Sequence, residues 1–290
     1  ARSGGSSQRY FWISGTTCNI CSMSAGERVG PPSPVRFSPP ERAVIGIIQI
    51  ATDMTMDTEG ATLIAQVPGV SVRMAKIAFD SEEICAETYE DAFAKGRVKF
   101  AADSISLPTG YVTLYGIACT SLSFLIGKER LASQLPSGAP MVTMWEAVCA
   151  ALRALDVRRV AVLTPYIAAV HDRNLVLLEK EGFEVVRSMS LGLTVDRETS
   201  AVDKSYLREC ATTLAGPGAD ALFIGCSAFR ACVPGLISDL EAELGMPVVT
   251  STQAFLWHVL RTAGIQDKLE GYGALFSMKD AHFSTTLPGG

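Results

Sequence analysis

Two segments of this chain share one plan, and the repetition limits the fold more than any other feature of the sequence. In the first segment, the apolar run from Tyr111 to Ala118 leads into Cys119, a hydroxyl-rich turn and a helical pattern. In the second, the run from Ala221 to Gly225 leads into Cys226, which is followed by Ser227. A strand that ends at a cysteine and leads into a helix, present twice, predicts two related units with one thiol in each.

Strand and helix patterns alternate along the chain from Ala43 onward. The predicted strands are Val44 to Ile50, Val70 to Ile77, Tyr111 to Ala118, Pro140 to Thr143, Arg159 to Leu163, Phe183 to Ser190, Ala221 to Gly225 and Met246 to Thr250. The predicted helices cover 58–66, 82–100, 120–134, 145–155, 168–181, 204–215, 233–244 and 252–263. This alternation predicts an α/β fold of two similar Rossmann-like (flavodoxin-like) domains. Their parallel sheets would be related by pseudo-twofold symmetry, with an active site in the cleft between them.

The first forty-one residues differ from the rest, because they are rich in glycine, serine and proline and more basic than acidic. Such a segment predicts a poorly ordered extension over 1–41, compatible with a transit peptide or with a later start at Met23. Cys18 and Cys21 form a C-x-x-C pair, but no second pair follows, so an incidental pair is favoured over a metal site. We expect residues 42–143 plus 251–280 to form the first domain and residues 144–250 the second.

Composition excludes several classes of function. A net charge of −5 gives no basic footprint for nucleic acid, and the longest apolar run, around Val44 to Ala51, is too short to span a bilayer. Eight cysteines in 290 residues are too few for a dense disulfide framework. Several lie in apolar runs, which suits free thiols in a reducing compartment, so we predict a cytoplasmic protein.

Polar residues follow the strands where a parallel sheet binds ligands, at the carboxyl ends. If the two domains face each other, these ends converge on one cleft. A cysteine at a helix N-terminus should have a lowered thiol pKa, and nearby backbone N–H groups should bind a carboxylate. The predicted site residues are Cys119 and Cys226, with Asp53, Thr120, Ser121, Tyr166 and Ser227 around the substrate.

Each of these residues has a simpler interpretation. Asp53 fits a helix N-cap as well as a site, and Tyr166 fits a core tyrosine. The other ordered cysteines and the three histidines show no ligand spacing, which predicts packing roles for the cysteines and no metal. The sequences G-x-x-x-x-G-K and G-x-G-x-x-G do not follow any predicted strand, so no phosphate or dinucleotide cofactor is expected.

Six segments in order resemble the aspartate/glutamate racemase superfamily, in the branch of maleate cis–trans isomerases, arylmalonate decarboxylases and the ectoine-utilisation protein EutA. They are IGIIQIATDMT, YGIACTSLSFLIG, VAVLTPY, ALFIGCSAFRA, PVVTSTQA and GYGALF. The resemblance implies two facing domains, no cofactor, no metal and a small carboxylate substrate, and it is compatible with a homo-oligomer. Cys119 would be the nucleophile or base, and Cys226 the partner acid or base.

Two positions separate the branches of this superfamily. Arylmalonate decarboxylases carry glycine at the position of Cys119, so its presence favours an isomerase or racemase over a decarboxylase that uses Cys226 alone. Maleate isomerases tend to carry asparagine at the position of Asp53, so a carboxylate there points away from maleate and toward a nitrogen-bearing or EutA-type substrate. A non-catalytic small-molecule binding protein is the third hypothesis.

Overall fold

Two four-stranded parallel sheets form the framework of the computed structural model, which describes residues 41–83 and 85–278. The first sheet has the order β2-β1-β3-β4 and comprises β1 (Ala43–Ile50), β2 (Val70–Ile77), β3 (Leu114–Ile117) and β4 (Met141–Thr143). The second has the order β6-β5-β7-β8 and comprises β5 (Arg159–Thr164), β6 (Glu184–Ser190), β7 (Ala221–Ile224) and β8 (Val248–Thr250). The equivalent strand order confirms the predicted duplicated α/β fold.

The central strands are buried on both faces because helices cover both sides of each sheet. Every residue of β1 is buried, as are all four residues of β3 and of β7. The helices of the first half are α1 (Ala61–Ile64), α2 (Ala86–Ala94), α3 (Arg97–Ile105), α4 (Thr120–Ile126), α5 (Lys128–Ala132) and α6 (Met144–Ala154). Those of the second are α7 (Ala168–Lys180), α8 (Asp196–Ala201), α9 (Lys204–Leu214), α10 (Leu236–Leu244), α11 (Ser251–Thr262) and α12 (Gly273–Ser277). A short π-helix, Met56–Gly60, precedes α1.

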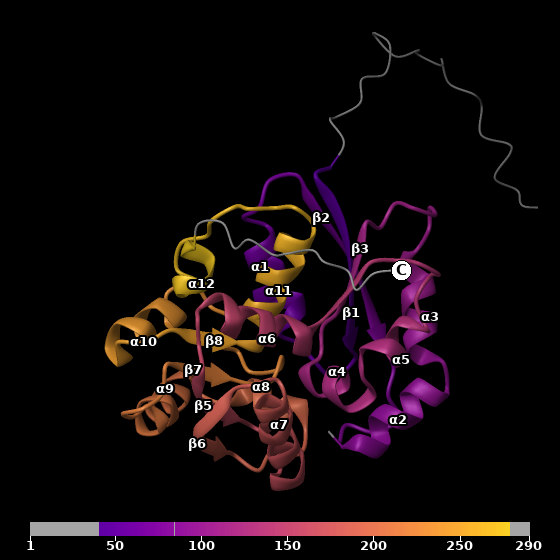
Figure 1. The fold of residues 1–290 in the computed structure, drawn as a ribbon. Helices are drawn as coiled ribbons and strands as arrows, with labels where there is room; N and C mark the ends of the chain where they lie inside the picture. Colours follow the sequence, from indigo (N-terminus) through magenta and orange to yellow (C-terminus); the bar gives the residue numbers. More distant parts are fainter. Residues whose placement is uncertain (1–40, 84, 279–290) are drawn as a thin grey trace, which may run out of the picture. The chain divides into compact units, whose positions relative to one another are not determined.

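Helices α6 and α11 pack against each other between the two sheets (Figure 1). Each begins directly after the last strand of its sheet with a capping box, Thr143 with Glu146 and Thr250 with Gln253. These reciprocal bonds satisfy backbone N–H groups at both helix starts. On the first sheet, Gly116 leaves room for Phe255 of α11, because a Cβ there would lie 2.5 Å from the ring. One shared apolar core therefore joins the two halves.

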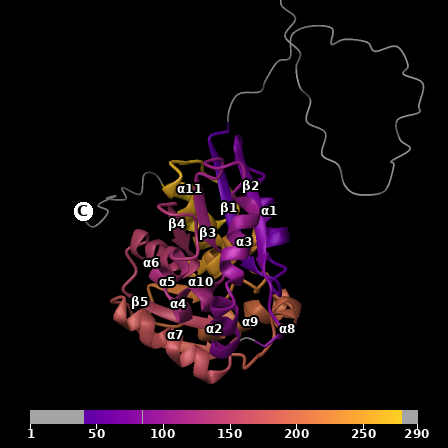
Figure 2. The ribbon, with the colours of Figure 1, turned by 90° about the vertical axis from the view of Figure 1, so that its right-hand side faces the viewer.

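The opposite face of the first sheet is covered by α3, which lies against β1 and β2 (Figure 2). The single helix predicted over 82–100 is instead two helices, because Gly96 has a left-handed backbone with φ 67°. The helix after Cys119 is likewise divided at Gly127, where φ is 88°. Glycine adopts these angles without steric penalty, so both helices end there.

The predictions for residues 1–40, including Cys18 and Cys21, lie outside the described residues, and the division into domains at 143 and 250 stays a prediction. Both sheets belong to one compact unit, Pro40–Gly290. Within the described ranges, no helix has the length and apolar character needed to cross a membrane.

Candidate active site

Cys119 caps the first turn of α4, as the sequence predicts. It follows β3 in an extended conformation, and its thiol accepts a hydrogen bond from the Leu122 N–H at 3.5 Å. The Ser121 hydroxyl lies 3.6 Å from the thiol and 2.7 Å from the hydroxyl of Tyr89. The Cys119 side chain is thus held between a helix N-terminus and two hydroxyls.

Cys226 follows β7 in a different way. The prediction that it also lies at a helix N-terminus is wrong, because the next helix, α10, begins only at Leu236. Pro234 and Gly235 precede that helix, and an earlier start would place the proline inside it. Cys226 instead has φ 134°, a region that residues with a side chain rarely adopt, and its N–H donates to the Ser251 hydroxyl at 3.0 Å.

The loop after Cys226 is held from both halves of the protein. Thr55, just before the π-helix, donates to the Ala228 carbonyl at 3.0 Å, and Thr252 of α11 donates to the Ser227 carbonyl at 3.3 Å. The Cys232 N–H donates to the Glu59 carboxylate at 2.9 Å. Several long-range bonds therefore fix a loop that is not itself helical or extended.

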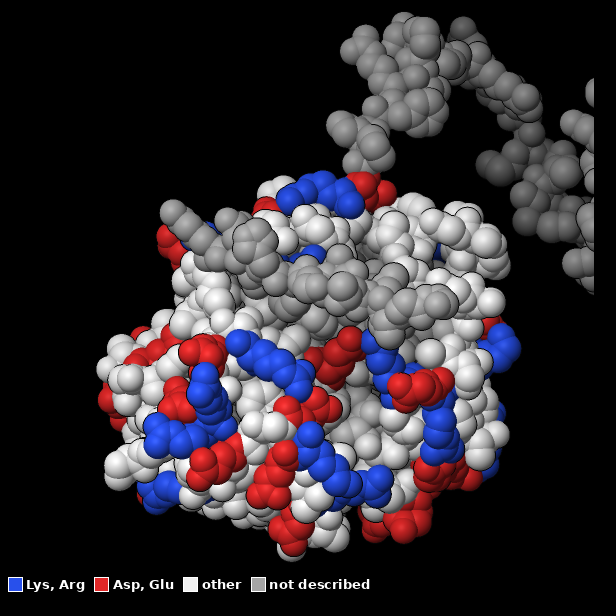
Figure 3. Space-filling view, viewed as in Figure 1, with Lys and Arg blue, Asp and Glu red and all other residues white. Residues whose placement is uncertain are grey.

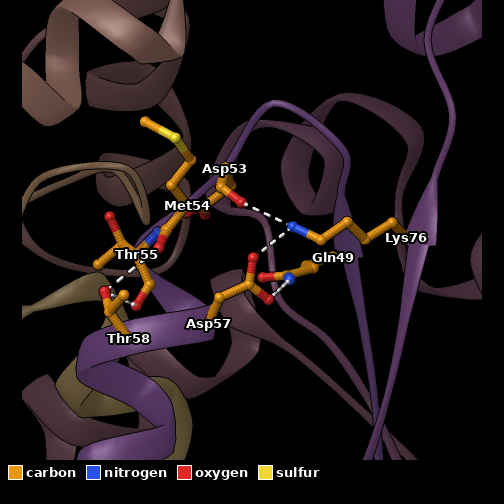
Figure 4. Close-up of polar contacts among 7 residues, drawn as sticks. All are labelled: Gln49, Asp53, Met54, Thr55, Asp57, Thr58 and Lys76. Atoms are coloured by element: carbon orange, nitrogen blue, oxygen red, sulfur yellow. Dashed lines mark hydrogen bonds and ion pairs between the residues drawn. The ribbon is translucent and has the colours of Figure 1, made fainter.

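Asp53 lies at the end of β1 with its side chain fully buried. Its Oδ1 accepts from the Thr55 N–H at 2.7 Å within a local turn, but Asp53 is not the N-cap of the next helix, because that position is Thr55. Burial raises the pKa of Asp53, while the Ser227 hydroxyl and the backbone N–H groups of Thr55 and Met56 lower it. Figure 4 shows Lys76 donating to the backbone carbonyl of Asp53 and pairing with Asp57 rather than with the Asp53 carboxylate.

Tyr166 and Tyr89 are both buried beside the thiols. The ring of Tyr166 packs edge-on against Phe124, with centroids 6.5 Å apart. Burial raises the pKa of Tyr166 well above its ordinary value, and its closeness to Cys226 and Cys119 raises it further. Tyr89 was missed by sequence reasoning, because its place in the pattern of α2 is that of an ordinary core residue.

Asp196 is the second residue that the sequence did not indicate. It is the first residue of α8, a helix that was not predicted, and it is 2% exposed. Thr52 donates to its carboxylate at 2.5 Å, which links the second half of the protein to the end of β1. Burial raises the pKa of Asp196 to about 7, and the charge of Asp53 adds to the increase. The only signal in the sequence, an acidic residue at a helix start, does not distinguish this position from an exposed one.

The two thiols share one electrostatic environment. Burial raises the pKa of Cys119 to about 12 and that of Cys226 well above its ordinary value. The charges of Asp196 and Asp53 raise the pKa of both thiols, and Cys119 raises that of Cys226. The lowered thiol pKa expected at the helix N-terminus is therefore wrong, because desolvation of the Cys119 thiolate outweighs the hydrogen bond from Leu122.

The other predicted site residues are also buried here. The Thr120 hydroxyl donates to the Met144 sulfur at 3.1 Å, which leaves it turned toward the core. Ser121 and Ser227 lie beside Cys119 and Asp53, respectively. The structure thus brings the seven predicted residues together, but the hydroxyl of Thr120 is turned toward the core.

A cavity of about 300 Å³ lies next to this cluster. It is lined by Ala51, Thr52, Met54, Glu82, Asp196 and Arg197. Neither thiol lines this cavity, and both are nearly inaccessible, at 2% and 5% exposure. Figure 3 shows acidic and basic side chains interspersed over one face of the molecule, with no continuous patch of one sign.

The remaining described cysteines have other surroundings. Cys149, Cys210 and Cys232 are buried among apolar residues, as predicted, and Cys85 is half-buried with its sulfur 3.1 Å from the Thr88 hydroxyl. Across the described part of the chain, no group of three or more His, Cys, Asp or Glu side chains is arranged to hold a metal ion.

Duplicated parallel sheets with a thiol after the third strand of each place the chain in the aspartate/glutamate racemase superfamily, as its sequence motifs predict. Within that superfamily the chain belongs to the arylmalonate decarboxylase family, whose model, "Arylmalonate decarboxylase", matches residues 45–276.

Two relatives and one solved structure illustrate the similarity. Arylmalonate decarboxylase from Bordetella bronchiseptica is 36% identical over 165 residues, which cover 54% of this chain and 68% of that protein. Maleate isomerase from Nocardia farcinica is 25% identical over 253 residues, covering 82% and 96% of the two chains. A mutant of the maleate cis–trans isomerase from Nocardia farcinica with a covalently bound succinylcysteine intermediate has the same fold, with a TM-score of 0.73 at 23% identity over 82% of this chain and 99% of that chain. Relatives of this chain thus include both a decarboxylase and an isomerase.

Proposed function

We propose that this protein is a cofactor-independent isomerase or racemase that acts on a small carboxylic acid through Cys119 and Cys226. The observation that carries the proposal is the pair of buried thiols, one from each half, which both lie close enough to Tyr166 to raise its pKa. A decarboxylase that uses only the second thiol has no need of a cysteine at position 119. The relationship to both a decarboxylase and isomerases is compatible with this chemistry.

The two thiols would act on opposite faces of the reacting carbon. One sulfur, as the thiolate, removes a proton or adds to the substrate carbon, and the other thiol delivers a proton from the far side. The Ser121 and Ser227 hydroxyls, with backbone N–H groups at the start of α4, stabilise the charge that develops on the substrate oxygen. The hydroxyl of Tyr166, which lies beside Cys226, would donate a hydrogen bond to the substrate.

The raised thiol pKa values determine the protonation state from which the reaction starts. The raised pKa values keep both sulfurs protonated near neutral pH, so one proton must leave before the first step. The Asp196 carboxyl, with a pKa of about 7, is a buried group near both thiols that titrates close to neutral pH. The charge of ionised Asp196 raises the pKa of both thiols, so the reaction should speed up only as pH rises above neutral toward the raised thiol pKa values, where a growing fraction of the protein carries an active thiolate.

One specific observation favours a second candidate, decarboxylation of a disubstituted malonate through Cys226. The family model that matches the chain is that of arylmalonate decarboxylase, and the Bordetella enzyme is 36% identical over the matched region. In this case Cys119→Gly should keep or increase the release of CO₂, whereas it should abolish a two-thiol reaction.

Proton exchange in D₂O tests these alternatives. The wild-type protein, Cys119→Ala and Cys226→Ala are incubated with maleate, aspartate, glutamate, phenylmalonate and diaminobutyrate derivatives, and each substrate is followed by NMR. Cys232→Ala is the matched control, because Cys232 is a buried thiol on the same loop as Cys226, and the hydrogen bond to Glu59 comes from its backbone N–H, which the substitution keeps. Loss of either site thiol should lower turnover by roughly 10²–10⁴-fold, and the control should stay near wild type.

The outcomes separate the hypotheses. Deuterium at one carbon, or conversion of maleate to fumarate, lost in both site variants supports the two-thiol mechanism. Near-normal turnover by Cys226→Ala would refute it. No turnover of any compound by the wild-type protein would instead favour a binding protein.

A further inference from the structure

Two buried carboxyl groups from opposite halves of the protein meet next to the thiols. Asp53 follows β1 of the first sheet, and Asp196 begins α8 in the second half. They are 0% and 2% exposed, and Thr52, the neighbour of Asp53, donates a hydrogen bond to Asp196. The charge of each carboxylate raises the pKa of both Cys119 and Cys226, so both carboxyl groups lie near the two thiols.

The hydrogen bonding of Asp53 is incomplete. Its Oδ1 accepts from the Thr55 N–H, but its buried Oδ2 has no hydrogen bond of normal geometry from any residue in the described part of the chain. The neighbouring Ser227 hydroxyl lowers the pKa of the group without completing that geometry. A buried carboxylate oxygen without a donor is costly, and a bound ligand that supplies a donor removes the cost.

Nearby cations of the chain are engaged elsewhere. Lys76 pairs with Asp57 at 2.5 Å and donates only to the backbone carbonyl of Asp53. Arg197, beside Asp196 in sequence, lies at the exposed mouth of the cavity and pairs with Glu82 at 3.8 Å. Among the described ion pairs, none involves Asp53 or Asp196. The charge of Lys76 lowers the pKa of Asp53 from a distance, but neither carboxyl group has an ion pair of its own among the described residues.

We infer that Asp53 and Asp196 bind a cationic nitrogen of the substrate, so that the substrate is a small carboxylic acid that also carries an ammonium or amidinium group. An ammonium group offers three donors and a positive charge, which suit one oxygen of each carboxylate. A second carboxylate of the substrate at the same place would be repelled and would lose its hydration. The inference rests on the proposed function, since it assumes that the thiol cleft is the substrate site.

Matched ligand pairs that differ only in the ammonium group test this inference. Binding of aspartate and succinate, alanine and propanoate, and phenylglycine and phenylacetate to the full chain is measured by calorimetry. The amino member of at least one pair should bind about 10-fold or more tightly, the value expected for one charged hydrogen bond. Asp53→Asn and Asp196→Asn should each remove that preference, and Asp53→Asn should also improve binding of succinate.

Glu198→Gln is the matched control, because Glu198 is an exposed carboxylate on the same helix as Asp196. Equal affinity within every pair, tighter binding of the des-amino members, or binding of neither member would overturn the inference. A preference for the amino member that survives in both asparagine variants would also overturn the inference. Loss of the preference in only one variant would refute joint binding of the nitrogen by Asp53 and Asp196. The binding measurements need no turnover. They can therefore refute the ammonium site while the exchange experiment supports the two-thiol mechanism, or support the site while the exchange experiment refutes the mechanism.

Discussion

Replacing Asp196 with asparagine should stabilise the protein at pH 8, although it removes a hydrogen-bonded side chain. Asp196 is buried, and its pKa is raised from the ordinary value of 3.8 to about 7. Between these values the folded protein holds a proton that the unfolded chain releases. The free energy of unfolding therefore falls as pH rises from about 4 to about 7.

The size of the effect follows from the shift in pKa. Each unit is worth about 1.4 kcal/mol, so an increase of roughly three units destabilises the wild-type protein by about 4 kcal/mol above pH 7. The penalty is fully absent only below about pH 4, and at pH 5 it is still roughly 2 kcal/mol. Asparagine has nearly the same shape and no charge, and its amide oxygen can still accept from Thr52. It should escape the penalty at every pH.

Urea denaturation at pH 5 and pH 8 checks this reasoning. The stability of Asp196→Asn relative to wild type should increase by about 2–3 kcal/mol between the two pH values. Glu198→Gln, on the exposed side of α8, should show no comparable change. A difference that does not depend on pH, or a variant that is less stable than wild type at pH 8, would show that Asp196 is not a buried carboxyl with a raised pKa.

Two further substitutions test the packing and the loop. Gly116→Ala places a methyl group 2.5 Å from the Phe255 ring and should destabilise the protein by about 1–3 kcal/mol. Calorimetry should show this as a lower Tm. An unchanged Tm would argue against close contact between α11 and the first sheet. Thr55→Val removes a 3.0 Å hydrogen bond to the loop after Cys226 and should make the Cys226 thiol alkylate faster. Thr58→Val loses only bonds within its own turn and should leave the alkylation rate unchanged. Equal alkylation rates in the two threonine variants would contradict the anchoring role of Thr55.

Local sequence determined the framework of this protein. The apolar β-branched run of β1 can be satisfied only in the interior of a parallel sheet, and the repeat of strand, cysteine and hydroxyl residue predicted the second sheet from the first. Cys119 was placed correctly at a helix start because a cap depends on residues within one turn of it. The closeness of both thiols to Tyr166 agrees with the rule that functional groups gather at the carboxyl ends of parallel strands.

Tertiary structure decided the chemistry of the cleft. The pKa of a thiol depends on its burial and on charges from distant parts of the chain, and here both outweigh the helix N-terminus that the sequence indicates at Cys119. The loop after Cys226 is shaped by hydrogen bonds from Thr55 and Thr252, which no local pattern records. In sequence, Asp196 has the pattern of an ordinary helix start. Folding of the second half places it against Thr52, and its burial follows from the whole fold rather than from its neighbours in sequence.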